Sequence, residues 1–409
     1  MSRQVRDAYV VAATRTPIGR APKGVLRHMR PDDLLVHALR GALAQAPSLD
    51  PAAIEDAIVG CAIPEAEQGL NVARMGVLLA GLPDTVAGVT VNRFCASGLT
   101  AVAMAADRIR VGEADVMIAA GTESMSMVPM MGNRPSLNPA AFAADENVGI
   151  AYGMGLTAEK VAQQWKVSRE AQDAFAYESH RRAVAAQQAG EFADEISPID
   201  VVQKFPNLAS GEIEVMTRTV TLDEGPRADT SAEALARLRP VFASPRTPGG
   251  KSTGMGSVTA GNSSQTSDGA GALILVSEDA LKRFGLTPLA RFVSFAVRGV
   301  PPEIMGIGPK EAIPVALERA GIKQQDLGWI ELNEAFAAQS LAVIQDLGLD
   351  PAVVNPLGGA IALGHPLGAT GAIRSATVVH GLRRRKAKYG MVTMCVGTGM
   401  GAAGIFERV

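Results

Sequence analysis

Apolar residues along the chain form short β-branched runs separated by longer stretches with a helical period, and this alternation occurs twice. Near the start, the strand-like runs YVVAATRTP (9–17) and DAIVGCA (56–62) lie on either side of the amphipathic stretch DLLVHALRGALAQA (33–46). Near the end, the same order is repeated by RFVSFAVRGVP, EAIPVALERAG and GWIELNEAF. Strands that are apolar at nearly every position are typical of sheets covered by helices on both faces. The pattern predicts two similar α/β halves.

Each half continues into a helix of small residues followed by another apolar strand. The two small-residue helices are SGLTAVAMAA (97–106) and LGATGAIRSA (367–376), and the strands after them are VMIAAGTES and MVTMCVG. The matching parts of the chain extend over Tyr9–Thr122 and Arg291–Met400. If the halves pack on one another, these two helices become buried between the two sheets.

The chain between the halves differs from them in its residue pattern. From about Met125 to Gly250 it carries Pro, Asn and Gly clusters around one long polar helical stretch, 157–190, which ends at Gly190. We interpret this part as an inserted cap, a place where substrate binding is expected. The predicted division is a first half at 1–122 and 251–280, an inserted loop domain at 123–250, and a second half at 281–409.

Composition excludes several classes of function. The chain has 409 residues, of which 47% are hydrophobic and 20% charged, and it contains no apolar run long enough to span a membrane. A net charge of -2 gives no general attraction to nucleic acid, and the basic run at 383–386 is interpreted as a solvated helix end. We therefore expect a soluble globular protein that neither spans a membrane nor binds nucleic acid.

Cysteine is scarce, with Cys61, Cys95 and Cys395 widely spaced and no CxxC pair. This pattern argues against a disulfide framework or a metal site such as a zinc site, and fits a reducing compartment in which a thiol can act as a reagent. An apolar run begins too close to the start to leave room for a signal peptide, and the final GIFERV is not a peroxisomal signal. A cytoplasmic location is the expectation.

Two apparent nucleotide-binding motifs are set aside. GMGAAG (399–404) satisfies GxGxxG, but it lies near the end of the chain with no βαβ unit after it. GGKST (249–253) resembles the end of a P-loop, yet Pro245 stands where the first glycine is needed. Neither motif supports nucleotide binding.

Four short segments carry residues that could do chemistry: CAS at Cys95, NEAF at Asn333, GHP at His365 and CVG at Cys395. Each segment alone is weak, because free Cys and single His residues are often core residues. The repeat, however, puts all four at corresponding strand ends of the two halves. Cys95 follows a strand and precedes a helix, so its sulfur is expected to meet the positive end of the helix dipole, which favours a thiolate.

With these segments the chain resembles a thiolase of the 3-ketoacyl-CoA type over nearly its whole length. Further matching segments are MGLTAEKVA, SREAQDAFA, TAGNSSQTSDGAG, PPEIMGIGP and NPLGGAIALGHPLGATGA. The resemblance implies a five-layered αβαβα core of two similar halves with a loop domain inserted in the first. It also implies a homodimer or homotetramer that uses acyl-CoA and CoA as substrates, without a tightly bound cofactor.

The resemblance also assigns roles to site residues. Cys95 would be the acylated nucleophile, His365 the base that activates it, and Cys395 the acid and base that serves the enolate and the incoming CoA. One oxyanion site would use His365 with a water held by Asn333, and another the backbone N–H groups of Cys95 and Gly397. Expected CoA contacts are Met154, Arg227, Phe242, Ser264 and Phe336.

Two positions differ from short-chain acetoacetyl-CoA thiolases, which have a histidine where this chain has Gly153 and a residue other than arginine at Arg93. Both resemble degradative thiolases of broad chain length. A biosynthetic acetoacetyl-CoA thiolase remains the alternative, because it needs the same catalytic residues. A thiolase-fold protein that binds acyl-CoA or lipid without catalysis is more remote, since both cysteines and the histidine are present. The run at 243–256 is longer than in compact relatives and has no assigned purpose.

Overall fold

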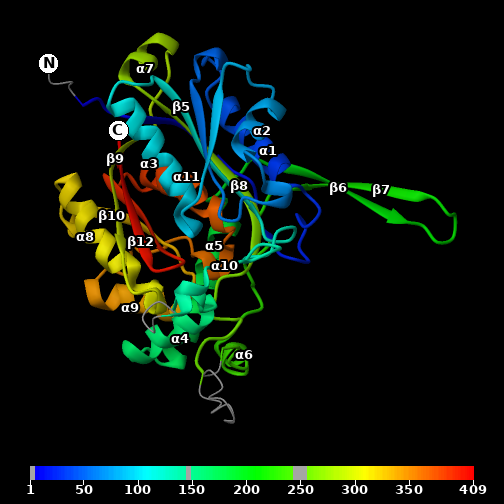
Figure 1. The fold of residues 1–409 in the computed structure, drawn as a ribbon, viewed down its shortest axis with the longest axis vertical. Helices are drawn as coiled ribbons and strands as arrows, with labels where there is room; N and C mark the ends of the chain where they lie inside the picture. Colours follow the sequence, from blue (N-terminus) through cyan, green and yellow to red (C-terminus); the bar gives the residue numbers. More distant parts are fainter. Residues whose placement is uncertain (1–4, 144–148, 243–255) are drawn as a thin grey trace.

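The computed structural model describes residues 5–143, 149–242 and 256–409, and a large mixed sheet with helices on both faces forms its core (Figure 1). The strands of the first half are β1 (Tyr9–Arg15), β3 (Asp56–Gly60), β4 (Ala87–Val91), β5 (Val116–Ser124) and β8 (Ser267–Val276). Those of the second half are β9 (Ala290–Gly299), β10 (Leu327–Leu332), β11 (Tyr389–Val396) and β12 (Met400–Arg408). The short β2 (Gly19–Arg20) pairs with β8.

The strand order shows the predicted repeat directly. It runs β4-β3-β5-β8-β1 and continues as β9-β12-β11-β10, so that the second half mirrors the first. In each half the strand after the small-residue helix (β5 or β11) pairs in parallel on one side and antiparallel on the other. The strands of the two halves join where β1 and β9 pair antiparallel, with Tyr9 opposite Arg291 and Val10 opposite Ala290. The prediction of two similar α/β halves is confirmed.

The two small-residue helices, α3 (Ser97–Arg110) and α11 (Leu367–Arg385), lie against one another between the two halves. Their backbones approach so closely that a Cβ at Gly371 would stand 2.0 Å from the backbone nitrogen of Leu99. Side chains larger than hydrogen cannot be fitted there without moving a backbone. The Gly- and Ala-rich composition of both stretches is thus explained by helix packing at the centre of the molecule.

Outer helices complete five layers in the order αβαβα. α1 (Pro31–Gln45) and α2 (Val72–Leu79) cover the first half, and α8 (Gly308–Ala320) and α9 (Ala337–Leu347) cover the second. Two shorter helices are α7 (Glu278–Phe284) and α10 (Ala360–Leu363). Short 3-10 segments occur at Pro51–Ala53, Ala66–Gln68, Phe94–Ala96, Pro139–Phe142, Pro302–Ile307 and Gln324–Asp326.

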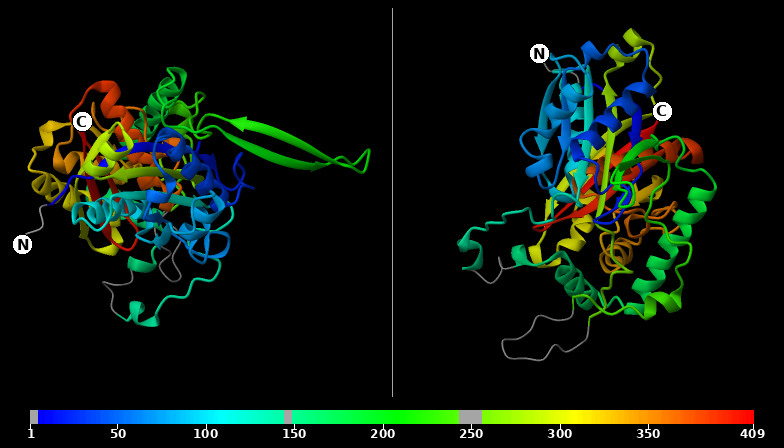
Figure 2. Two further views of the ribbon diagram at one scale, coloured as in Figure 1. Left: turned by 90° about the horizontal axis from the view of Figure 1, so that it is seen from above. Right: turned by 90° about the vertical axis from the view of Figure 1, so that its right-hand side faces the viewer.

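The segment between β5 and β8 contains the helices α4 (Met154–Gln164), α5 (Arg169–Gln188) and α6 (Ala232–Ala236), and the hairpin β6 (Ile199–Pro206) with β7 (Ile213–Val220). The hairpin, which the sequence did not predict, extends away from the body of the molecule (Figure 2).

The prediction of one long helix over 157–190 is wrong, because the chain leaves helical geometry between α4 and α5. Lys166 has φ of +54°, and the Ser168 side chain accepts a hydrogen bond from the Ala171 N–H and so starts a new helix. The second helix does end before Gly190, which has φ of +71°. The proposed limits of the three parts of the chain stay a prediction.

The structure also locates the basic run at 383–386 and one of the two apparent nucleotide-binding motifs. The basic run at 383–386 forms the end of α11, and Arg383, Arg385 and Lys386 are exposed. The sequence GMGAAG lies at the start of β12, in agreement with its dismissal as a nucleotide loop, whereas GGKST and nearly all of the run at 243–256 lie outside the described residues. Among the helices described, none is long and apolar enough to cross a membrane.

Candidate active site

Cys95 lies in the sharp connection between strand β4 and helix α3. Phe94 adopts φ of +41°, and this strained residue is held on both sides by side chains. The Asn92 side chain accepts a hydrogen bond from the Phe94 N–H at 2.8 Å, and the Ser97 hydroxyl donates to the Phe94 carbonyl at 2.7 Å. Ser97 also accepts from the Arg93 N–H at 2.8 Å. The connection thereby holds Cys95 at the surface of a cleft, although only 8% of the residue is exposed.

Burial dominates the ionisation of Cys95. It raises the pKa of this thiol to about 11, while the backbone N–H groups of Gly397 and of Cys95 itself donate to the sulfur and oppose the shift. Donation from the Cys95 N–H at the helix N-terminus favours the thiolate, as expected, but burial outweighs it in the free protein. At neutral pH the thiol is protonated, so its use as a nucleophile requires a base close by.

His365 lies between α10 and α11, where its backbone N–H donates to the Ser267 hydroxyl at 3.1 Å. The Thr370 hydroxyl donates to the Pro366 carbonyl at 2.9 Å, so toward the imidazole, 2.6 Å away at Nδ1, it acts as an acceptor. Nδ1 therefore carries the proton and Nε2 keeps its lone pair. Burial, together with the charge of Arg374, lowers the pKa of His365 to about 3. The ring is neutral and can accept a proton at Nε2.

Asn333 follows β10 and directs its side chain to the same imidazole. Its Nδ2 lies 3.3 Å from His365 Nε2, and its backbone N–H donates to the Thr393 carbonyl on β11 at 2.9 Å. The Asn333 Oδ1 atom is buried and has no hydrogen-bond partner among the described residues. Buried polar atoms are usually paired, so this oxygen is suited to a donor that arrives with water or substrate.

Cys395 lies near the end of β11 and is completely buried. Burial raises its pKa well above the usual value, and the negative charge that Cys95 can carry adds to the rise, as expected for two neighbouring thiols. Two residues farther along, Gly397 directs its N–H to the Cys95 sulfur, just before a turn with positive φ at Thr398 and Gly399. Strand ends from the two halves thus meet at one point.

The sulfur and the imidazole face a common cleft of about 540 Å³, lined by both Cys95 and His365. Four of the five expected CoA contacts also line it: Met154, Phe242, Ser264 and Phe336. Asn333, Cys395 and Gly397 are buried. Cys395 packs in one cluster with Met154, Phe242 and Phe336 of the cleft lining, and Gly397 reaches the Cys95 sulfur. The fifth expected contact, Arg227, lines an adjoining cavity of about 340 Å³. The two cavities share Arg20, Ala260 and Gln265 as lining residues.

Family models match both halves of the chain: the thiolase N-terminal domain at residues 8–279 and the thiolase C-terminal domain at residues 286–408. The chain belongs to the thiolase family. Thiolases are acyltransferases, and this protein is therefore an enzyme of that class.

Individual thiolases are similar to the chain over its full length. A 3-ketoacyl-CoA thiolase of Bacillus subtilis is 50% identical, covering 98% of this chain and 100% of that protein. A peroxisomal 3-ketoacyl-CoA thiolase of Arabidopsis thaliana is 45% identical over 98% of this chain and 84% of its own. The crystal structure of human mitochondrial 3-ketoacyl-CoA thiolase has a TM-score of 0.86 and 39% identity, covering 99% of both chains.

Sequence reasoning missed several residues in and around the thiolase cleft. Thr370, which fixes the tautomer of His365, had a weak signal as a hydroxyl in the first turn of the helix after GHP. Met125, Met130 and Met305 line the cleft as well, but their positions depend on how distant segments fold together. A single sequence carries no local sign that these methionines share one cavity.

Proposed function

We propose that this thiolase cleaves 3-ketoacyl-CoA with CoA, giving acetyl-CoA and an acyl-CoA shortened by two carbons, through a thioester on Cys95. The observation that carries the proposal is the arrangement around one sulfur. Two backbone N–H groups reach the Cys95 sulfur, and a neutral imidazole that can accept a proton at Nε2 lines the same cleft. The names of the similar proteins support the same reaction.

In the first half-reaction, the Cys95 proton moves to His365 Nε2 as the sulfur attacks the keto carbon. The bond between the α and β carbons then breaks, leaving the acyl group on Cys95 and an acetyl-CoA enolate. The Cys395 thiol gives its proton to the enolate carbon, and acetyl-CoA leaves. Preorganised N–H donors at an oxyanion contribute about 3 to 4 kcal/mol each, and the N–H groups of Cys95 and Gly397 are suited to this role.

In the second half-reaction, the Cys395 thiolate takes the proton from the thiol of CoA. The CoA sulfur attacks the thioester, the acyl group transfers to CoA, and the Cys95 sulfur regains its proton from His365. Both cysteines and the imidazole return to their starting states, so the cycle is balanced. A thioester on cysteine is close in energy to an acyl-CoA, which keeps the transfer reversible.

The pH-dependent groups fit this division of roles. With the pKa of Cys95 near 11 and that of His365 near 3, the free enzyme holds a neutral thiol and a neutral imidazole. The proton therefore moves only when substrate is present and the developing oxyanion is stabilised. Asn333, beside His365 Nε2, would hold a water that forms one oxyanion site together with His365.

For substrate binding, Met154, Phe242, Ser264 and Phe336 would contact the pantetheine part of CoA in the cleft. Arg227, 57% exposed at its side chain in the adjoining cavity, would contact the far end of CoA. CoA is a substrate in this scheme and not a resident cofactor. A solved human mitochondrial 3-ketoacyl-CoA thiolase in complex with CoA, 38% identical with a TM-score of 0.85, supports this binding. Assembly as a homodimer or homotetramer and a cytoplasmic location complete the proposal.

The biosynthetic alternative is the reverse condensation of two acetyl-CoA molecules, for which a Bacillus anthracis acetyl-CoA acetyltransferase structure (37% identity, TM-score 0.86) is a relevant neighbour. The degradative reaction is favoured by Gly153, which lines the cleft and leaves open space where a Cβ would stand.

Thiolysis rates with 3-ketoacyl-CoAs of increasing length test the proposal. We expect turnover of medium-chain substrates. Turnover of acetoacetyl-CoA alone would favour the biosynthetic alternative, and no thiolysis of any length would refute the proposed activity.

A further inference from the structure

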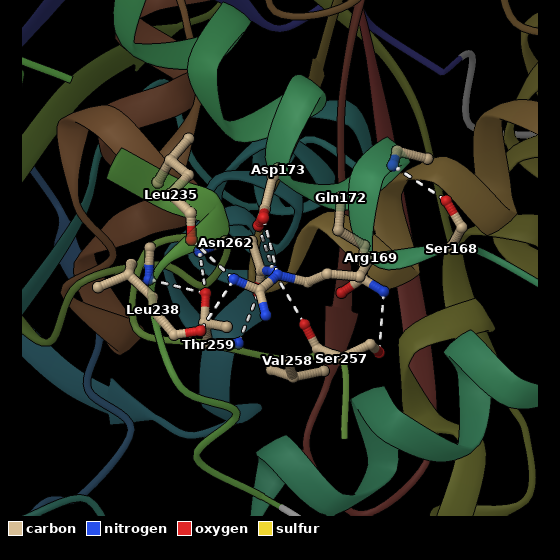
Figure 3. A network of polar contacts seen from close by, with 12 residues as sticks. Ser168, Arg169, Gln172, Asp173, Leu235, Leu238, Ser257, Val258, Thr259 and Asn262 are labelled. Carbon is tan, nitrogen blue, oxygen red and sulfur yellow. Dashed lines mark hydrogen bonds and ion pairs between the residues drawn. The ribbon is translucent and has the colours of Figure 1, made fainter. Parts of the chain in front are cut away.

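A buried carboxylate on α5 joins two segments that are far apart in the sequence. Asp173, 5% exposed, accepts hydrogen bonds from Arg169 Nε at 2.7 Å and from Asn262 Nδ2 at 2.9 Å (Figure 3). Asn262 is completely buried. The guanidinium and the carboxylate form a charge-assisted hydrogen bond, which is stronger than one between neutral groups. Arg169, Asp173 and Asn262, called here the anchor triad, do not line the cleft.

The Arg169 end of the anchor triad fixes the segment after α6. Arg169 Nη2 donates to the carbonyl of Leu235 in α6 at 2.7 Å and to that of Leu238, just after the helix, at 3.0 Å. A few residues after Leu238 in the sequence, Val241 and Phe242 line the cleft. One side of the cleft wall therefore takes its position from a guanidinium on α5.

The Asn262 end fixes the neighbouring segment of the same wall, 257–264. The Asn262 Oδ1 atom accepts from the Thr259 N–H at 2.8 Å, and Nδ2 also donates to the Ser257 carbonyl at 3.1 Å, so one side chain closes the turn (Figure 3). Thr259, together with Ser264 just beyond this turn, lines the cleft. The Asn262 carbonyl accepts from the Ala337 N–H at 2.9 Å, which ties the turn to the second half.

Through these contacts the anchor triad holds two irregular segments of the cleft wall at once. The segments at 238–242 and 257–264 are irregular, although the Val241 N–H donates to the Val258 carbonyl at 2.9 Å. Loops without a ladder of hydrogen bonds hold a defined shape only where side chains fix them. The anchor triad bonds both segments to α5, and Glu159 on α4 also accepts from the N–H groups of Ser257 and Val258 at 2.8 Å. Side chains of these two helices therefore hold this side of the cleft.

We propose that Arg169, Asp173 and Asn262 are positioning residues that hold the cleft wall in the geometry that binds the CoA part of the substrate. The inference rests on the proposed function. It predicts that loosening the anchor triad weakens CoA binding much more than it slows acyl transfer at saturating substrate, since Cys95 and His365 are held by other contacts.

The test replaces Arg169 with lysine (R169K), which keeps the charge but cannot span Asp173 and two carbonyls with a planar fork. The matched control is R181K on the same helix, where Arg181 is exposed and, within the described part of the chain, forms its hydrogen bonds and ion pair with Glu178. Calorimetry measures the Kd of CoA, steady-state kinetics gives KM and kcat, and thermal unfolding gives Tm. We expect R169K to raise Kd and KM about tenfold, the effect of losing one hydrogen bond to a charged group. R181K should match the unaltered enzyme.

Equal CoA affinity in R169K and R181K would overturn the positioning role. So would a loss of kcat in R169K with Kd unchanged. Either result can occur while the unaltered enzyme cleaves 3-ketoacyl-CoA, so a failure of this inference is distinct from a failure of the proposed function. If R169K does not fold, D173N gives a second test, because it keeps the side-chain shape and an acceptor for Asn262 while removing the charge opposite Arg169. The same rise in Kd is expected.

Discussion

The tautomer of His365 depends on one hydroxyl group, and its removal gives a defined test of the site. Thr370→Val keeps the shape of the side chain but removes the acceptor that lies 2.6 Å from Nδ1. His365 and Thr370 are 4% and 1% exposed, so water does not readily replace the lost partner. A buried donor without a partner costs about 1 to 3 kcal/mol. The imidazole can relieve this cost by turning or by moving its proton to Nε2, and both changes remove the proton acceptor facing the cleft.

If the whole cost destabilises the orientation and tautomer of His365 in which Nε2 accepts the Cys95 proton, the rate of Cys95 acylation should fall about 5- to 150-fold. Rapid-quench measurement of the acyl-enzyme at saturating acyl-CoA gives this rate. Thr370→Ser keeps the hydroxyl and should recover most of it. The control is Ser375→Ala, which removes a buried hydroxyl that donates only to the Gly371 carbonyl of the same helix at 2.7 Å. Wild-type acylation in folded Thr370→Val would refute the reasoning that this hydroxyl sets the tautomer.

Three further predictions concern the second cysteine, the acyl path and pH. Cys395→Ser should still form the acyl-enzyme in a single turnover, but overall turnover should fall about 10²- to 10⁴-fold; absence of acylation in the folded variant would show that Cys395 takes part in the first covalent step. Gly153→His should lower the kcat/KM for medium-chain substrates relative to acetoacetyl-CoA, and an unchanged length profile would contradict the assignment of this open space to the acyl path. Burial, followed by the charge of Arg227, lowers the pKa of His180 to about 4. Between pH 6.5 and 4 the unfolded chain therefore binds a proton at this histidine that the folded chain does not bind. Acidification through this range should lower the free energy of unfolding by up to about 3 kcal/mol. Denaturant unfolding at several pH values should show a smaller loss for His180→Gln, and an equal loss would contradict this contribution.

The sequence predicted the parts of the fold that depend on local pattern and repetition. The two α/β halves followed from alternating strands and helices, and the central packing of α3 and α11 followed from their small residues. The segments carrying Cys95 and His365 could be brought to one site because the repeat places each just before a small-residue helix, α3 or α11. The expectation of a strand end is wrong for His365, which follows the short helix α10. These features can be predicted from a single sequence because they depend on neighbouring residues in the chain or on the internal repeat.

Other features depend on contacts across the fold and were missed or wrong. The break between α4 and α5 needs only a left-handed residue at Lys166, which a continuous helical period does not reveal. The raised pKa of Cys95 results from burial by distant segments, and it outweighs the helix N-terminus that the sequence indicated. The anchor triad likewise joins residues 89 positions apart at Asp173 and Asn262, with no local signal for the pair.

The most direct test of the central claim is the site of the acyl group after the enzyme is mixed with acyl-CoA in the absence of free CoA. The intact protein should gain the mass of one acyl group, and peptide mapping by mass spectrometry should place it on Cys95. Cys95→Ala should lose the adduct while keeping its fold, because the change removes a nucleophile and little core volume. An adduct on Cys395 or Cys61, or one that persists in Cys95→Ala, would contradict the account.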